Sequence, residues 1–205
     1  MIKSIIFDLG KVIVPFDFNR AYERMSAHSG LPITEIRSRL IKSDLFRTFE
    51  TGSIEPGEFV TQVCSLLDFT IEYKEFCEIW SSIFFPETLV SAALLESLSR
   101  NYRLVLLSNT NAIHFEMIRE NYPLLRHFHE FVLSFEVGAM KPSPVIYRKA
   151  VEAAGCKPEE CLFFDDIGEN IEGARGEGLD GVLFLGAKQL DMELRARGIL
   201  DGLGS

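Results

Sequence analysis

The sequence predicts an α/β fold in which a parallel sheet carries helices on both faces, with a helical segment inserted after the first strand. Two observations carry this prediction. Short apolar runs bounded by turn residues alternate with helical patterns from residue 103 onward, which is typical of a doubly wound, Rossmann-like sheet. Residues 17–86 break that alternation, because their apolar residues mostly follow helical spacing. We therefore expect a core of residues 1–16 and 87–205, and a helical insert of residues 17–86.

Five short runs of β-forming residues predict the strands. They lie at residues 4–7, 104–107, 131–133, 161–164 and 182–185. Continuous apolar runs of this length are typical of strands that are buried on both faces. Helical spacing of apolar residues predicts helices at residues 88–100, 112–121, 145–154, 170–178 and 187–197. The Gly-rich tail, residues 198–205, is expected to fray.

The composition of the 205-residue chain excludes several classes of protein. Hydrophobic residues make up 47% and charged residues 25%, which is typical of a folded chain rather than a disordered one. The formal net charge of −9 disfavours a nucleic-acid partner, and no apolar run is long enough to span a membrane. Cys64, Cys77, Cys156 and Cys161 lack the close spacing of a zinc site, and no cleavable signal precedes the first strand. We expect a cytoplasmic protein that binds neither nucleic acid nor membranes, and the sequence leaves its oligomeric state open.

Polar residues follow several of the predicted strands. In an open parallel sheet, ligands bind beyond the carboxyl ends of the strands. The residues found there, directly or after a loop, are Asp8, Ser108, Asn109, Lys141, Asp165 and Asp166. Because these strand ends share one edge of the sheet, we expect carboxylates, a hydroxyl and a cation to converge there.

Four segments that contain these residues resemble the motifs of haloacid dehalogenase-like hydrolases. They are FDLGKVIV at 7–14, LSNTN at 107–111, KPSPVIY at 141–147 and FDDIGENI at 164–171. The motifs occur in order and span most of the chain, and four in register are far more specific than one. Within that superfamily they are most similar to bacterial sugar-1-phosphate phosphatases of the glucose-1-phosphatase type and to the phosphatase half of soluble epoxide hydrolases. The resemblance implies a Mg²⁺-dependent phosphatase of small phosphorylated metabolites, in which residues 17–86 form an α-helical cap.

The resemblance also implies roles for individual side chains. Asp8 is the nucleophile that forms an aspartyl-phosphate intermediate, and Lys141 supplies a cation beside the nucleophile and the bound phosphate. Ser108 and Asn109 donate hydrogen bonds to phosphate oxygens. Without the motif around Asp8, Ser108 and Asn109 would be interpreted as a cap for the helix predicted at 112–121.

Magnesium is the cofactor that this chemistry requires, because a carboxylate and a phosphate dianion repel each other until a cation lies between them. By resemblance, Asp8, the main-chain carbonyl of Gly10 and Asp166 hold the metal. Asp165 and Asp166 are adjacent, so strand alternation directs them to different sides and one of them is the direct ligand. We choose Asp166, and we expect Asp165 to hold Lys141 or a metal-bound water, although family members use either acid.

At position 10 the chain departs from the family pattern. Most phosphatases of this superfamily carry a second aspartate two residues after the nucleophile, which serves as general acid and base, whereas this chain has Gly10. The main-chain carbonyl is retained, so we expect the metal site to survive. A positioned proton donor contributes roughly 10²–10⁴-fold to a rate. We therefore expect slow turnover of simple alkyl phosphates and better turnover of esters with an acidic leaving oxygen, such as sugar 1-phosphates.

Two other functions are compatible with these motifs. The superfamily includes 2-haloacid dehalogenases, which use an aspartate nucleophile without a metal, but that reaction gains nothing from an acid pair such as Asp165 and Asp166. The glycine at position 10 is also compatible with a catalytically weak protein that binds a phosphorylated ligand. Retention of Asp8, Lys141 and Asp166 favours an enzyme over such a binding protein.

Several further side chains have two interpretations. The insert residues that could line a closed pocket over a substrate are Arg20, Phe46, Phe49 and Glu50. The simpler interpretation is that the two phenylalanines pack helices together and the two charged residues face solvent. His114 follows the second motif closely and could face the site, but a position on the surface of its helix is the default expectation. His127 and His129 alternate as H-x-H, yet no third metal ligand is nearby in the sequence, so we expect them in a loop or at a helix end.

Overall fold

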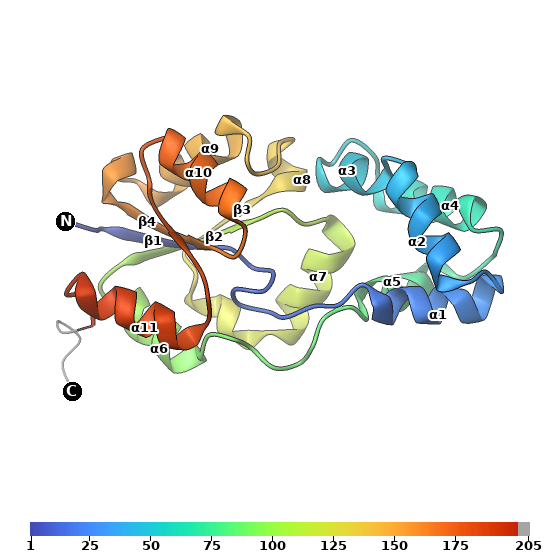
Figure 1. Ribbon diagram of the computed structural model, residues 1–205, viewed down its shortest axis with the longest axis horizontal. Helices are drawn as coiled ribbons and strands as arrows, with labels where there is room; N and C mark the ends of the chain where they lie inside the picture. Colours follow the sequence, from blue (N-terminus) through green and yellow to red (C-terminus); the bar gives the residue numbers. More distant parts are fainter. Residues whose placement is uncertain (201–205) are drawn as a thin grey trace.

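The computed structural model describes residues 1–200, and its centre is a five-stranded parallel sheet (Figure 1). Its strands are β1 (Ser4–Phe7), β2 (Arg103–Ser108), β3 (Glu130–Leu133), β4 (Cys161–Asp165) and β5 (Asp180–Leu183). The strand order is β3-β2-β1-β4-β5, so β1 lies in the middle and the chain order reverses beside it. The fold class predicted from the sequence is confirmed.

Helices cover both faces of this sheet (Figure 1). They are α6 (Ala92–Ser99), α7 (Ala112–Asn121), α8 (Ser134–Val137), α9 (Pro144–Ala154), α10 (Gly168–Gly176) and α11 (Ala187–Ala196), with 3₁₀ turns η1 (Pro123–His127) and η2 (Pro158–Glu160). Because side chains alternate along a strand, Ile5 and Phe7 of β1 enter the hydrophobic core under α6, α7 and α11. Ile6 enters a second core under α9 and α10. Burial on both faces explains why the central strands read as continuous apolar runs.

The boundaries of some core elements differ from those predicted. Helix α6 begins four residues later than predicted, because Ser91 caps it by accepting a hydrogen bond from the backbone N–H of Leu94. Strand β5 begins and ends two residues earlier than the predicted run at 182–185. Helix α10 also begins and ends two residues earlier than the predicted helix at 170–178. At the edges of the sheet, Phe131 and Leu183 are partly exposed, so burial on both faces holds for the central strands alone.

The Gly-rich tail is ordered in its described part. The side chain of Ile199 is buried in the core beneath α11, which differs from the predicted fraying. The rest of that tail, residues 201–205, lies outside the described residues. None of the helices within residues 1–200 combines the length and the apolar character needed to cross a membrane.

Five helices between β1 and α6 form a layer of their own, which we call the cap (Figure 1). They are α1 (Asn19–Ser29), α2 (Ile33–Lys42), α3 (Leu45–Glu50), α4 (Pro56–Leu66) and α5 (Tyr73–Ser81). Their centre is aromatic: the ring of Phe49 stacks on that of Phe59 at 4.1 Å, and Trp80 packs edge-on against Phe59 at 5.0 Å. Most cap hydrophobic side chains join this separate cluster, so the cap has a core of its own.

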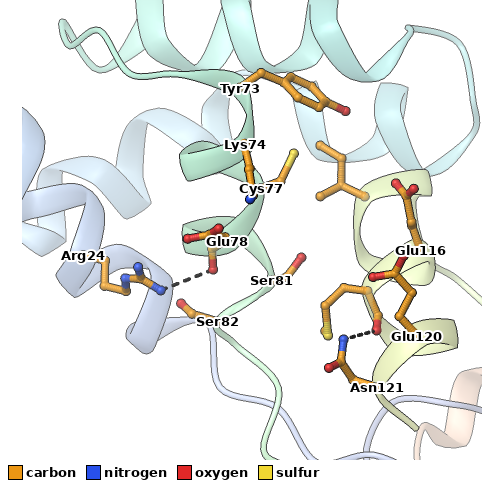
Figure 2. A pocket seen from close by; sticks show the side chains of 12 residues that line it. Arg24, Tyr73, Lys74, Cys77, Glu78, Ser81, Ser82, Glu116, Glu120 and Asn121 are labelled. Atoms are coloured by element: carbon orange, nitrogen blue, oxygen red, sulfur yellow. Dashed lines mark hydrogen bonds between the residues drawn. The ribbon is translucent and has the colours of Figure 1, made fainter. Parts of the chain in front are cut away.

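The cap meets the rest of the protein on two sides. Two connecting segments run side by side, where the backbone N–H of Asp17 donates to the carbonyl of Ile83 at 2.8 Å. On one side α5 packs against α7, and on the other side α3 packs against α8 (Figure 1). A groove of about 640 Å³ runs between α5 and α7 and is lined by residues such as Cys77 and Glu116 (Figure 2). None of the polar residues at the strand ends lines this groove.

Candidate active site

The register of the sheet brings two distant carboxylates together. Phe7 of β1 is paired with Phe164 of β4, so the residues that follow them, Asp8 and Asp165, leave the sheet side by side. The backbone N–H of Asp8 donates to the carbonyl of Phe164 at 2.9 Å and fixes this arrangement. Asp165 is fully buried, and 7% of the surface of Asp8 is exposed.

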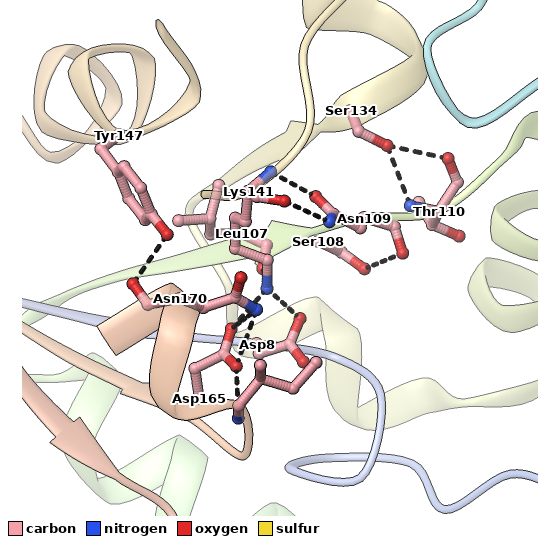
Figure 3. Close-up of polar contacts among 11 residues, drawn as sticks. Asp8, Leu107, Ser108, Asn109, Thr110, Ser134, Lys141, Tyr147, Asp165 and Asn170 are labelled. Carbon is pink, nitrogen blue, oxygen red and sulfur yellow. Dashed lines mark hydrogen bonds and ion pairs between the residues drawn. The ribbon is translucent and has the colours of Figure 1, made fainter. Parts of the chain in front are cut away.

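Lys141 lies between these two carboxylates (Figure 3). Its Nζ donates to Asp8 Oδ1 at 2.6 Å, to Asp165 Oδ2 at 2.7 Å and to the carbonyl oxygen of Leu107 at 3.1 Å. All three ammonium protons therefore have acceptors, which allows the side chain to be buried. Burial alone would lower the pKa of Lys141, but the charges of Asp8 and Asp165 outweigh this effect and raise it.

Donors from the start of α10 hold the side chain of Asp165 in place. Asp165 Oδ1 accepts from the backbone N–H of Ile167 at 2.9 Å, and both of its oxygens lie within 3.1 Å of Asn170 Nδ2. The hydroxyl of Tyr147 in α9 donates to the Asn170 carbonyl at 2.7 Å, and this bond anchors the first turn of α10 to α9. With Lys141 added, the oxygens of Asp165 are occupied by donors within the protein.

The side chain of Asp8 receives fewer hydrogen bonds than that of Asp165. Burial raises the pKa of Asp8 to about 7, and the charge of Asp165 adds to this rise while that of Lys141 opposes it. Burial and the charge of Asp165 also raise the pKa of the half-buried Asp166. The site therefore holds more negative charge than its own groups neutralise.

The residues present fit a hard divalent cation. Asp8, Asp165 and Asp166 each offer a carboxylate oxygen, and these atoms lie within 4.8 Å of one another. Three carboxylates and one lysine leave a formal charge of −3 + 1 = −2 when all are ionised. Oxygen donors and a double negative charge match the preference of Mg²⁺. Because Asp165 is already bound by Lys141 and Asn170, Asp8 and Asp166 are the two acids with capacity for such an ion.

The loop after β2 supports Lys141 from the other side. The Asn109 side chain donates from Nδ2 to the Lys141 carbonyl at 3.0 Å and accepts at Oδ1 from the Lys141 N–H at 2.8 Å. One amide hydrogen of Asn109 is therefore used on the protein backbone, and the other remains for a ligand. Ser108 makes a single long contact, 3.4 Å to the Asn109 carbonyl, so its hydroxyl is free to turn to another acceptor. A reciprocal bond pair between Thr110 and Ser134, which the sequence did not reveal, ties this loop to α8.

His114 is not at the surface, contrary to the sequence expectation. It lies 4% exposed between core and cap, its Nε2 3.0 Å from the carbonyl oxygen of Trp80 and its Nδ1 3.0 Å from Asn111 Nδ2. Because the Trp80 carbonyl can only accept, Nε2 carries the proton and Nδ1 accepts from the amide. Burial lowers the pKa of His114 to about 4, so the ring is neutral. Asn111, rather than Ser108 or Asn109, caps α7 by accepting from the His114 N–H.

His127 and His129 lie just before β3, at the opposite end of that strand from the site. His127 ends η1, and His129 Nδ1 accepts from the Leu104 backbone N–H at 2.9 Å. The two histidines are therefore at a helix end and in a loop, as the sequence indicated.

Gly10 faces an aromatic ring. A Cβ at this position would lie 2.7 Å from the Phe16 ring, so Phe16 fills the space that a side chain at position 10 would need. Gly10 and Phe16 both line a small cavity of about 60 Å³ between the cap and the strand ends. Ser108, Asn109 and Glu50 line it as well.

Of the four insert residues considered in the sequence analysis, three pack against other side chains and one, Glu50, lies at the cavity. Phe49 is buried in the cap and Phe46 packs beside it, while Arg20 stacks over the ring of Phe85 at 4.5 Å. Glu50 is half-buried at the cavity, which corrects the expectation that it faces solvent. The spacing within α3 could not reveal this, because the burial depends on where α3 meets the core.

Comparisons with known proteins agree with this fold and show the family. The model of the haloacid dehalogenase-like hydrolases matches residues 2–178, and the chain belongs to this family. Among curated relatives, the D-ribitol-5-phosphate phosphatase of Bacteroides thetaiotaomicron is 31% identical over 180 residues, which cover 83% of this chain and 86% of that protein. A phosphatase of Mycobacterium tuberculosis is 30% identical over 192 residues, covering 89% and 87%. The family resemblance inferred from the four motifs is therefore confirmed.

A solved structure shows the same architecture with a metal. The magnesium complex of a haloacid dehalogenase-family enzyme from Bacteroides thetaiotaomicron superposes with a TM-score of 0.82 at 27% identity, covering 95% of this chain and 98% of that one. Another structure of that enzyme, with magnesium and inorganic phosphate, has a TM-score of 0.81 at 28% identity, covering 89% and 94%. An L-2-haloacid dehalogenase from Xanthobacter autotrophicus, at 18% identity and a TM-score of 0.61, shares the fold.

Proposed function

We propose that this protein is a Mg²⁺-dependent phosphatase that hydrolyses small phosphorylated metabolites through an aspartyl-phosphate on Asp8. The observation that carries the proposal is the buried group of Asp8, Lys141 and Asp165, with Asp166 close enough to complete a cation site. The magnesium complexes of one related enzyme and the phosphatase names of the relatives support it.

In this mechanism Lys141 orients the nucleophile. Its bond to Asp8 Oδ1 fixes the carboxylate, which leaves the second oxygen to attack phosphorus. Asp165 acts through Lys141, because it holds the ammonium in place from the opposite side. Lys141 also places a positive charge where phosphate oxygens would lie, and the Ser108 hydroxyl and the second amide hydrogen of Asn109 are the proposed donors to those oxygens.

Asp8, Asp166 and the Gly10 carbonyl are the groups that would hold Mg²⁺. When bound, the ion supplies positive charge that offsets the repulsion between the Asp8 carboxylate and a phosphate dianion. Without it, burial already disfavours the ionised form of Asp8. The three carboxylates therefore explain why phosphate hydrolysis here would require a metal ion. Displacement of a halide by an aspartate would not require one.

The substrate class is a small phosphorylated sugar or polyol. The cavity of about 60 Å³ holds a few water molecules, so a substrate enters when the cap moves and fills the site when it closes. We propose that residues 17–86 are the cap domain that makes this movement over a core of residues 1–16 and 87–205. Relatives are named for D-ribitol 5-phosphate and for glyceraldehyde 3-phosphate, and sugar 1-phosphates are the further candidates that Gly10 suggests.

An assay with an aryl phosphate, with and without Mg²⁺, tests the proposed function. We expect release of phosphate that requires Mg²⁺ and is lost in Asp8→Asn, while the circular dichroism spectrum is retained. A panel of sugar 1-phosphates, sugar 6-phosphates and polyol phosphates then ranks the substrates. Absence of activity across the panel, or metal-independent halide release from a 2-haloacid, would overturn the proposal.

A further inference from the structure

An alkyl phosphate needs a proton donor at its leaving oxygen. When the bond between phosphorus and an alkyl oxygen breaks, the electron pair stays on a strongly basic oxygen, and a positioned acid contributes roughly 10²–10⁴-fold to such a step. Position 10, beside the nucleophile, cannot supply that acid because Gly10 has no side chain and the Phe16 ring fills the adjacent space. The donor must therefore come from another element.

Two other ionisable groups near the cavity, Lys141 and His114, are already engaged. The three ammonium protons of Lys141 are bonded to Asp8, Asp165 and the Leu107 carbonyl. His114 also lines the cavity, but its one ring proton is bonded to the Trp80 carbonyl. Neither group can release a proton to a substrate without breaking contacts that hold the site or the cap.

Glu50 lines the same cavity and is not engaged. It is the last residue of α3 and reaches the cavity from the cap, opposite Ser108 and Asn109. No hydrogen bond or ion pair to its carboxyl group is found within residues 1–200. A half-buried carboxyl group without a partner in the protein is available to a ligand.

Close contact between cap and core fixes the position of Glu50. The turn after α3 contains Gly52 with φ +66°, and a Cβ there would lie 2.0 Å from the carbonyl oxygen of Phe135 in α8. This approach is closer than any residue with a side chain could make. Glu50, two residues earlier, is therefore held at the point where the cap touches the core.

We propose that Glu50 is the general acid and base of the phosphatase, supplied by the cap in place of a group at position 10. The inference rests on the proposed function. In the first step an oxygen of Asp8 bonds to phosphorus, the ester P–O bond breaks, and the leaving oxygen takes the proton of the Glu50 carboxyl group, which releases the alcohol. In the second step water attacks phosphorus, its proton passes to the Glu50 carboxylate, and the bond between phosphorus and Asp8 breaks to give inorganic phosphate.

The electrostatics of Glu50 are consistent with this role. Burial raises the pKa of Glu50 to about 7, and the charge of Lys141 opposes the rise. A carboxyl group with such a pKa holds its proton near neutral pH and can also take one up. Burial and Lys141 are the two causes that shift the pKa of Glu50. The other ionisable groups on α3, on the elements packed against it and lining the cavity are Arg47, Glu35, Arg37, Arg39, Lys42, Glu58, Glu136 and His114.

The test compares two leaving groups in Glu50→Gln. An aryl phosphate releases an acidic phenol and needs little protonation, whereas a polyol phosphate such as ribitol 5-phosphate releases a basic alkoxide. We expect kcat/KM for the polyol phosphate to fall by roughly 10²-fold or more, and kcat/KM for 4-nitrophenyl phosphate to fall less than about tenfold. Glu72→Gln, at an exposed glutamate of the cap, is the matched control and should change neither value.

The pH profile gives a second readout. For the wild type, kcat/KM for the polyol phosphate should decline above about pH 7 as Glu50 loses its proton, and this limb should be absent in Glu50→Gln. Equal losses on both substrates, or an unchanged rate on the polyol phosphate, would overturn the role of Glu50. A wild type without Mg²⁺-dependent activity on the aryl phosphate would instead overturn the proposed function itself.

Discussion

Replacing Lys141 by methionine should destabilise the fold by several kcal/mol at pH 8. The change keeps the apolar length of the side chain but removes the ammonium that lies between Asp8 and Asp165. Two buried carboxylates whose oxygens lie within 4.8 Å of each other then face each other unpaired. At an effective dielectric constant of about 20, their repulsion is about 3.5 kcal/mol, which agrees with the ~3–5 kcal/mol typical for breaking a buried ion pair.

The sign of the pH dependence follows from the same charges. Without Lys141 the folded-state pKa of Asp8 rises further above its unfolded value, so the variant is least impaired below about pH 4 and loses stability as the pH rises through the raised value. We therefore expect the difference from wild type to be largest at pH 8 and smaller at pH 5.

Urea unfolding in the presence of EDTA measures this difference. Circular dichroism reports the whole fold, and the fluorescence of Trp80, the single tryptophan, reports the cap. Lys149→Met is the matched control, because Lys149 is exposed and pairs at the surface with Glu152, and we expect a change within about 0.5 kcal/mol. A loss below about 1 kcal/mol for Lys141→Met at pH 8, or a loss that does not vary with pH, would refute the reasoning.

Three further perturbations test other parts of the account. Asp166→Asn should weaken Mg²⁺ binding at least about tenfold by calorimetry, because it removes a charged ligand while leaving the Asp8–Lys141 pair intact; unchanged affinity would contradict the assignment. Because burial lowers the pKa of His114 to about 4, the free energy of unfolding should fall by up to about 3 kcal/mol as the pH drops from 6.5 to 4, and His114→Gln should reduce that slope in denaturant titrations. Gly52→Ala should destabilise the protein by at least about 1 kcal/mol and lower the rate on polyol phosphates more than on aryl phosphates, because the added methyl group separates α3 from α8; equal rates in wild type and variant would show that this contact does not position Glu50.

The core of the fold could be predicted because local sequence and global packing agree there. The run at 4–7 is buried at every position, and its apolar residues Ile5, Ile6 and Phe7 are contiguous because β1 packs on both faces of the sheet; a strand of this kind has few alternatives. The convergence of Asp8, Lys141 and Asp165 was also predictable, because parallel strand ends share one edge of the sheet. The helix at 112–121 was predicted with its observed bounds from the spacing of its apolar residues, although its cap is Asn111 rather than Ser108 or Asn109.

The contacts between cap and core could not be predicted from the sequence. His114 is typical of a surface helix by its polarity, yet it is buried because α5 packs on α7 and presents the Trp80 carbonyl. Glu50 is a polar residue at the end of a short helix, and its place at the cavity depends on how α3 meets α8. Both positions depend on the relative placement of two layers, which no local pattern encodes.

The most direct test of the account is to trap the phosphoryl group on the nucleophile. Wild-type protein mixed with substrate and Mg²⁺, quenched in acid within one turnover and digested, should yield a phosphorylated peptide that contains residue 8. Mass spectrometry should find the adduct on Asp8 and should find none after omission of Mg²⁺ or in Asp8→Asn. Turnover by Asp8→Asn at the wild-type rate, or a phosphoryl group on another residue, would contradict the central claim.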